Sequence, residues 1–252
     1  MIDTHCHLDH EAFATDREAV LQRSQSVGVN EWVIPAITLP RFAAMQALAS
    51  PHVHLAFGLH PLYYADHPDD ALNQLAHWLN HSRPLAIGEI GLDGMAPRAS
   101  QQQQMYWFSG QLAMAHALAL PVLLHVRKCH EEVLACLQNS RFSGGGIVHA
   151  FSGSLQQAQR YRQLGFCLGI GGVVTRPQAR RLHAVVQSVA DDALVLESDA
   201  PDLPPSACVG QRNEPAFISW VVQALAELRQ TTESHIATMT TNNARKVLRL
   251  PK

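Results

Sequence analysis

The chain opens with the stretch Met1-Ile2-Asp3-Thr4-His5-Cys6-His7, in which two histidines stand two residues apart beside apolar residues. Successive side chains of a β-strand point to opposite faces, so His5 and His7 share one face and Cys6 points to the other. Two imidazoles on one face are a pair of potential metal ligands. The His-x-His pattern is common in proteins, so its meaning depends on the rest of the chain.

Length and charge restrict the possible classes of protein. The chain has 252 residues, close to the roughly 250 that are typical of one α/β barrel. It carries 19 Lys and Arg against 21 Asp and Glu. This balance is not typical of a protein that coats duplex nucleic acid by neutralising phosphates, so we expect any nucleic-acid contact to be local.

Cysteine content and apolar runs bear on the cellular compartment. The 5 cysteines are odd in number and show no CxxC spacing, so neither a disulfide framework nor a zinc knuckle is indicated. The chain begins without a signal-peptide pattern, and no apolar run approaches the ~18 residues of a transmembrane helix. We therefore expect a cytoplasmic protein without a membrane partner. Nothing in the sequence indicates its oligomeric state.

A repeating pattern follows the opening stretch: a short run of Val, Ile and Leu, a polar end, then a longer segment of helical period. The pattern gives eight strands, with seven helices between them and two more after the last strand. The predicted strands are 2–7, 31–37, 53–60, 85–92, 122–126, 146–151, 166–174 and 194–199. The predicted helices are 16–27, 40–49, 69–80, 100–118, 130–139, 154–163, 177–189, 214–229 and 233–247.

This alternation predicts the fold class. Apolar strands separated by helices indicate a parallel sheet that is buried on both faces. Eight such units in a chain of this length predict a single (β/α)8 barrel of the TIM type that spans residues 1–252. An open, doubly wound sheet is the alternative. No linker, charge block or change in composition divides the chain.

Polar residues mark the ends of the predicted strands, where the active sites of such barrels lie. Ionised carboxylates and histidines are costly to bury there unless they are paired or bound to a cation, and a shared divalent metal would offset that cost. In the alternative interpretation each histidine is a hydrogen-bonded core residue and each acid a helix cap. The residues concerned are His5, His7, His60, Glu89, His125, His149 and Asp199.

Six segments together resemble the TatD family of metal-dependent hydrolases. They are His5-x-His7, Gly58-Leu59-His60-Pro61, Gly88-Glu89-Ile90-Gly91-Leu92-Asp93, His125-x-Arg127, His149-Ala150-Phe151-Ser152-Gly153 and Glu197-Ser198-Asp199-Ala200-Pro201. The resemblance spans residue 2 to about residue 248, in the order and at the spacing of the family. It implies a metallo-dependent hydrolase barrel with two divalent ions that cleaves phosphodiester bonds, usually as a deoxyribonuclease.

Carried over by position, the resemblance implies that His5, His7, Glu89 and Asp199 hold one metal ion. Glu89, His125 and His149 would hold the other, so Glu89 would bridge the two. Imidazole and carboxylate suit Zn²⁺ or Mn²⁺, and Mg²⁺ is a third candidate. The expected mechanism is attack by a water that the two metals activate and Asp199 orients or deprotonates, while His60 contacts the phosphate or protonates the leaving oxygen.

A phosphate substrate also needs hydrogen-bond donors from the protein. Three candidates are predicted on the same rim of the barrel: Arg127, Arg212 and Ser152, the last in a turn that opens a helix. The expected substrate is DNA or a nucleotide. The sequence departs from the family at Gly94-Met95-Ala96-Pro97 and at Lys128-Cys129-His130, and these changes concern the substrate rather than the metal ligands.

Two other functions remain open at this point. Amidohydrolase-like barrels share the His-x-His strand and cleave C–N or C–O bonds, but those with two metals usually bridge them with a modified lysine on strand four, where this chain has Glu89. A barrel that binds metal without catalysis is the other alternative. His60 and the rim arginines favour an enzyme that hydrolyses ester bonds, because a structural metal has no need of substrate-side donors.

Overall fold

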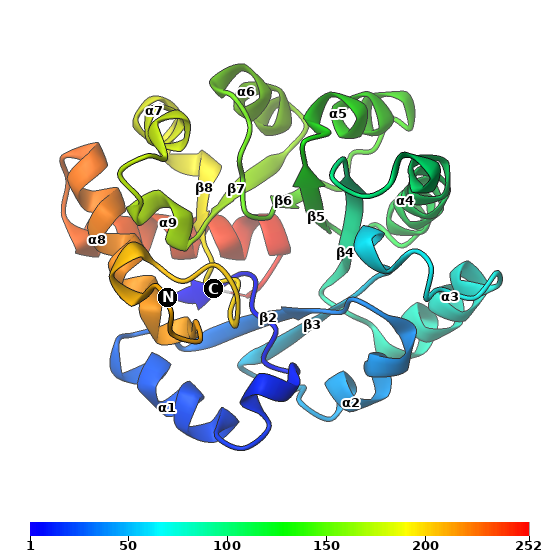
Figure 1. Cartoon of the computed structure of the whole chain (residues 1–252), viewed down its shortest axis with the longest axis horizontal. Coiled ribbons are helices and arrows are strands. Elements are labelled where there is room, and N and C mark those ends of the chain that lie inside the picture. Colours follow the sequence, from blue (N-terminus) through cyan, green and yellow to red (C-terminus); the bar gives the residue numbers. More distant parts are fainter. Residues whose placement is uncertain (252) are drawn as a thin grey trace.

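The computed structural model describes residues 1–251, and its eight strands form one parallel sheet in the sequence order β1 to β8. A parallel sheet needs a crossover segment between neighbouring strands, and here helices fill that role. Figure 1 shows the helices arranged around the strands. The strands are β1 (Ile2–Asp3), β2 (Glu31–Pro35), β3 (Val53–Phe57), β4 (Ala86–Asp93), β5 (Val122–Arg127), β6 (Gly146–Val148), β7 (Phe166–Ile170) and β8 (Leu194–Leu196).

The helices occur where the sequence predicts them, with ends displaced by a few residues. The largest displacement is in the predicted helix 214–229. Its α-helix begins only at Ile218, because a 3₁₀ turn, Pro215–Phe217, precedes it. The helices are α1 (Arg17–Ser26), α2 (Phe42–Gln46), α3 (Ala71–Ser82), α4 (Gln101–Ala117), α5 (His130–Asn139), α6 (Leu155–Gln163), α7 (Arg180–Ser188), α8 (Ile218–Arg229) and α9 (Glu233–Leu248).

The sheet curves until its first and last strands meet. The amide of Thr4 donates to the carbonyl of Leu196 at 3.0 Å, and the amide of Asp199 donates to the carbonyl of His5 at 2.9 Å. The Thr4 hydroxyl also donates to Leu196 O, at 2.8 Å. These bonds join the segment after β1 to β8 and its continuation. The predicted (β/α)8 barrel is therefore confirmed, and the open sheet is excluded.

One apolar layer fills the barrel near the amino-terminal ends of its strands. Each strand contributes one buried side chain to this layer, and Ala244 and Leu248 of α9 pack against it. In Figure 1, α9 lies inside the ring of the other helices. Because α9 covers this end of the barrel, polar side chains can gather only at the other end. The strand residues are Ile2, Val33, Ala56, Ala86, Leu123, Ile147, Cys167 and Val195.

A second, larger apolar layer separates the outer face of the sheet from the helices. It contains the bulky side chains Phe42, Phe57, Phe108 and Tyr161, which are almost fully buried. This layer fixes the strands from outside, so the strand ends are held rigidly. No helix within residues 1–251 combines the length and the apolar character that crossing a membrane requires.

Several strands are shorter than predicted, and the difference falls at their carboxyl ends. The first strand was expected to reach His7, but β1 ends at Asp3. The eighth was expected to reach Asp199, but β8 ends at Leu196. Ala150 and Asp199 have positive φ angles of 42° and 58°, which turn the backbone away from the ladder. The functional side chains beyond these strands therefore lie in turns.

The pairing of β4 with β5 gives a prediction about the fold. Gly91 pairs with His125 and has a φ of +141°, and a Cβ atom there would lie 2.0 Å from the His125 carbonyl oxygen. We expect Gly91→Ala to lower the free energy of unfolding by about 3 kcal/mol or more, from backbone strain and overpacking together. Urea unfolding followed by circular dichroism measures this change.

Gly28→Ala is the matched control, because Gly28 also has a positive φ, +87°, but a Cβ atom there would lie 3.8 Å from its nearest neighbour. We expect this control to lose only about 1–2 kcal/mol, from backbone strain alone. Equal losses in the two variants would show that the close contact with His125 has no energetic role.

Candidate metal centre

Seven polar side chains converge at the carboxyl end of the barrel. Glu89 lies on β4 and His125 on β5, while the other five lie just beyond the ends of β1, β3, β6 and β8. The barrel brings these ends together because all its strands are parallel and start at the end that α9 covers. The convergent residues are His5, His7, His60, Glu89, His125, His149 and Asp199.

Glu89 is the centre of this cluster, and its two carboxylate oxygens face different histidines. Oε2 lies 3.2 Å from His5 Nε2 and 3.8 Å from His7 Nε2. Oε1 lies 3.0 Å from His125 Nδ1 and 3.2 Å from His60 Nε2. The carboxylate thus stands between two sets of imidazoles. This is the placement that a carboxylate needs in order to bridge two cations.

Asp199 completes one side of the cluster. Its Oδ1 lies 3.8 Å from His7 Nε2 and 3.6 Å from His149 Nε2. The rings of His5 and His149 are stacked, with centroids 3.5 Å apart. The positive φ of Asp199, 58°, directs its side chain into the barrel mouth rather than along the sheet.

Burial and neighbouring charges determine the protonation of the cluster. Burial opposes ionisation of Glu89, but His60, His5 and His125 outweigh it and hold the pKa of this carboxyl well below its usual range. Burial lowers the pKa values of His5, His7 and His60. These three imidazoles are therefore neutral, which is the form that can bind a metal.

Asp199 and His149 behave differently from the rest of the cluster. Burial, reinforced by Glu89 and Glu197, raises the pKa of Asp199 to about 8. Burial alone would lower the pKa of His149, but Glu197 and Asp199 outweigh it and raise that pKa to about 10. Without a cation these side chains keep protons at neutral pH. A divalent cation would take the place of those protons.

Two buried carboxylates orient two of the imidazoles from behind. Asp93 Oδ2 accepts from His125 Nε2 at 3.0 Å, and Glu197 Oε1 lies 3.1 Å from His149 Nδ1. Asp93 accepts the proton of His125 Nε2, so the lone pair of His125 Nδ1 points into the cluster. Glu197 lies beside His149 Nδ1, so His149 Nε2 is the nitrogen that faces the cluster. His125 therefore presents Nδ1 to the centre, and His149 presents Nε2.

His60 has the opposite arrangement. Its Nδ1 accepts a hydrogen bond from the amide of Leu62 at 3.1 Å. A neutral imidazole that accepts at one nitrogen carries its proton on the other. The His60 Nε2 proton therefore points toward Glu89 Oε1 and His125 Nδ1, both at 3.2 Å. His60 therefore presents a hydrogen-bond donor to the cluster, whereas His125 presents a lone pair.

Asp3, the last residue of β1, links that strand to the segment that follows β8. Its carboxylate accepts from the amide of Ser198 at 2.9 Å and from the hydroxyl of Ser198 at 2.6 Å. Burial raises the pKa of Asp3 to about 7. Asn213 donates to the carbonyl of Ser198 at 2.7 Å. These contacts of Ser198 and Asn213 could not be predicted from the sequence, because single Ser and Asn residues carry no spacing signal.

The donor set fits divalent cations. Both ring nitrogens of His5 are buried without a hydrogen bond of proper geometry, which is an arrangement that a metal ligand satisfies. Ligand atoms within 4.8 Å of one another occur in three groups of three residues, and imidazole with carboxylate suits zinc or manganese. The groups are His5, His149 and Glu197; His5, His7 and Asp199; and His60, Glu89 and His125.

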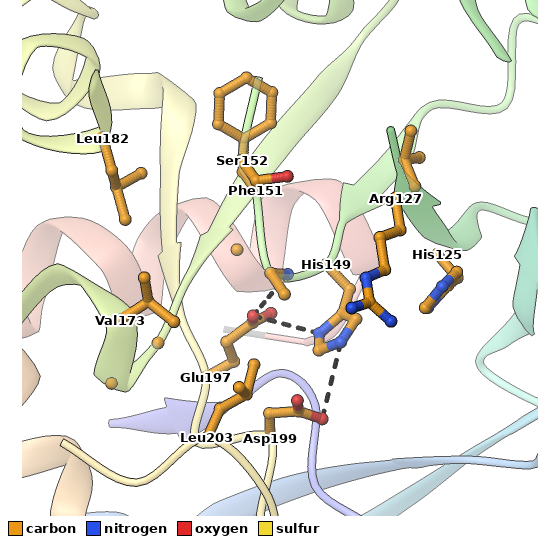
Figure 2. Close-up of a pocket in the computed structure, with 15 residues that line it drawn as sticks. His125, Arg127, His149, Phe151, Ser152, Val173, Leu182, Glu197, Asp199 and Leu203 are labelled. Carbon is orange, nitrogen blue, oxygen red and sulfur yellow. Dashed lines mark hydrogen bonds and ion pairs between the residues drawn. The ribbon is translucent and has the colours of Figure 1, made fainter. Parts of the chain in front are cut away.

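The predicted phosphate donors fall in different places. Arg127 and Ser152 line a cavity that His125, His149 and Asp199 also line, and Figure 2 shows Arg127 extending over His125 and His149. Arg212 instead pairs with Asp16 through bonds of 2.8 and 2.6 Å, and its guanidinium stacks over Phe13. The structure therefore places Arg212 in an ion-pair network outside this cavity.

Comparison with known proteins agrees with this geometry. The family model described as TatD related DNase matches residues 2–249. The uncharacterized metal-dependent hydrolase YjjV of Escherichia coli is 38% identical over 99% of this chain and 98% of its own length. The 3'-5' ssDNA/RNA exonuclease TatD of Pantoea ananatis is 31% identical over 99% of this chain and 100% of its own length.

A solved structure extends the comparison to three dimensions. The crystal structure of Escherichia coli YjjV superposes with a TM-score of 0.95, at 38% identity, and covers 100% of this chain and 98% of that chain. The agreement in sequence and in fold runs from the opening His-x-His to the last helix. The chain belongs to the TatD family.

Proposed function

We propose that the protein hydrolyses phosphodiester bonds with two divalent metal ions, on a DNA or nucleotide substrate. The placement of the Glu89 carboxylate between two sets of imidazoles carries this proposal. His5, His7, Glu89 and Asp199 would hold one ion, and Glu89, His125 and His149 would hold the other. Bound metals would supply an activated water and charge stabilisation at the phosphate oxygens.

The protein's own residues would perform the remaining steps. Asp199 would orient the attacking water and accept its proton. Arg127 and Ser152 would bind the phosphate. The Arg127 side chain is 58% exposed and its guanidinium lies 3.9 Å from Asp93 Oδ2, a loose ion pair that leaves N–H donors for a ligand at the mouth of the cavity.

His60 would donate a hydrogen bond from Nε2–H, whose proton the Leu62 amide keeps on that nitrogen, to the leaving oxygen as negative charge develops there. The departing alkoxide would take its proton from solvent. No covalent intermediate with the enzyme is needed.

Three observations support a nucleic-acid substrate over an amide or a lactone. Glu89, not lysine, occupies the bridging position on β4. A relative that is 31% identical over its whole length is named a ssDNA/RNA exonuclease. Arg127 also places a guanidinium beside the cluster, and guanidinium groups bind phosphate in a bidentate manner.

Removing the bridging carboxylate tests the proposal. We expect Glu89→Ala to lower hydrolysis of bis(p-nitrophenyl) phosphate by at least about 10³-fold and to reduce the bound metal, because both ions lose a ligand. Steady-state kinetics of the manganese-loaded protein, together with metal analysis by mass spectrometry, measure both effects. Exhaustive chelation of the parent protein should remove its activity, and manganese should restore it.

Glu132→Ala is the matched control, because Glu132 is an exposed carboxylate on α5 and its loss should leave the rate unchanged. Retention of activity within about tenfold in Glu89→Ala would contradict the bridging role. Cleavage of amides or lactones in preference to phosphodiesters would support the amidohydrolase alternative.

The role of His60 gives a second prediction, based on the leaving group. p-Nitrophenolate is a stable leaving anion, whereas the alkoxide of thymidylyl-thymidine depends on a hydrogen bond to its developing charge. We expect His60→Ala to lower the rate with thymidylyl-thymidine by about 10²–10³-fold, but with bis(p-nitrophenyl) phosphate by less than about tenfold. Metal content should not change. Equal losses with both substrates, together with loss of metal, would instead show that His60 is a ligand.

A further inference from the structure

A cavity of about 370 Å³ opens beside the metal-ligand cluster, between the ends of β5, β6, β7 and β8. Cavities that bind small molecules usually have volumes of about 300–1,000 Å³. This one is therefore large enough for one small organic group next to the reacting phosphate. The steps proposed above for metals, water and phosphate leave the greater part of it unused.

The walls of the cavity differ in chemistry from one end to the other. His125, His149 and Asp199 lie at one end, where the metals would bind. Figure 2 shows Val173, Leu182 and Leu203 on the side opposite His125 and Arg127, with Phe151 above them. Three of these apolar residues come from separate segments: Val173 from the 3₁₀ helix η5 (Gly172–Thr175), Leu182 from α7 and Leu203 from the loop after β8.

Three glycines form a further part of the wall, at positions 169, 171 and 172. Two of them are required by the fold. A Cβ atom on Gly169 would lie 2.0 Å from Glu197 Oε2, and one on Gly172 would lie 2.4 Å from the carbonyl oxygen of Leu203. Neither position can accept a side chain without moving its neighbours. The fold alone explains these two glycines, so they are not evidence for a ligand.

Gly171 is different, because nothing in the fold requires a glycine there. A Cβ atom at this position would make only ordinary contacts of 3.4 to 3.7 Å, all with Glu197. Its φ and ψ of −116° and −164° are extended values that other residues adopt. Gly171 therefore lines the cavity with backbone alone, and no side chain from this position occupies its space.

We propose that this cavity binds the nucleobase of the nucleotide whose phosphate lies at the metal centre. The inference rests on the proposed function and names the part of the substrate that the enzyme recognises. A nucleobase is a flat ring with apolar faces, which match the peptide wall at Gly171 and the side chains of Val173 and Leu182. The sugar would connect this base to the phosphate, which would lie near Arg127 and Ser152 at the polar end of the cavity.

Binding measurements separate the base from the phosphate. Isothermal titration of the manganese-loaded protein should show adenosine 5′-monophosphate binding at least about tenfold more tightly than ribose 5-phosphate, which lacks the base. Gly171→Val places a branched side chain on the cavity wall, so we expect this preference to fall to about twofold or less. Gly171→Ala should give an intermediate preference.

Val209→Phe is the control, since it adds apolar bulk at a residue that is 69% exposed and outside the cavity. It should leave the preference for the base unchanged. Metal content and thermal midpoint of the Gly171 variants are measured alongside, so that loss of folding or of metal is distinguished from loss of base binding. A parent protein without preference for the base, or a Gly171→Val protein that keeps it, would overturn the inference.

Hydrolysis of bis(p-nitrophenyl) phosphate separates this inference from the proposed function. Hydrolysis without a preference for the base would mean that the function holds and the cavity has another occupant. A preference for the base that Gly171→Val removes, in a protein without phosphodiesterase activity, would mean that the cavity binds nucleobases but the proposed reaction is wrong.

Discussion

The ionised carboxylate of Glu89, only 2% exposed, is the constraint on which the rest of the site depends. A buried negative charge is costly unless it is paired or bound to a cation. Here imidazoles on several different strand ends surround it, and two of them are held in position by Asp93 and Glu197. Only a closed parallel barrel brings these ends within a few ångströms of one carboxylate, so the fold and the charge of the site depend on each other.

The sequence predicted the barrel, the strand order and the convergence of the polar strand ends, because apolar periodicity and parallel pairing leave few other arrangements. It did not predict where the strands end. Ala150 and Asp199 turn the backbone with positive φ angles, and neither is a glycine that would mark the turn in the sequence. The donor role of the His60 Nε2 proton also depends on a local contact, the hydrogen bond from the Leu62 amide to His60 Nδ1, and the spacing of histidines does not reveal this side-chain conformation.

Arg212 and the apolar cavity show two further limits of sequence interpretation. An arginine after a strand end is a reasonable phosphate donor, yet Asp16 is separated from it by almost the whole chain and holds it through two hydrogen bonds. Val173 and Leu182 show the second limit, because they line the cavity but nothing in the sequence marks them. They are apolar residues among many others, and only the structure shows that they line a cavity as well as packing with the core.

The chain has a formal net charge of −2, so its overall field does not attract a polyanion. Binding of the proposed phosphodiester substrate would therefore depend on the site. Two divalent cations beside Glu89 and Asp199 would make the barrel mouth positive, and Arg127 adds to that charge. These groups act on any phosphate and cannot distinguish one ester from another. Selection among phosphoesters has to come from neutral surfaces next to the cluster, and the cavity at Gly171 is such a surface in direct continuity with the metal ligands.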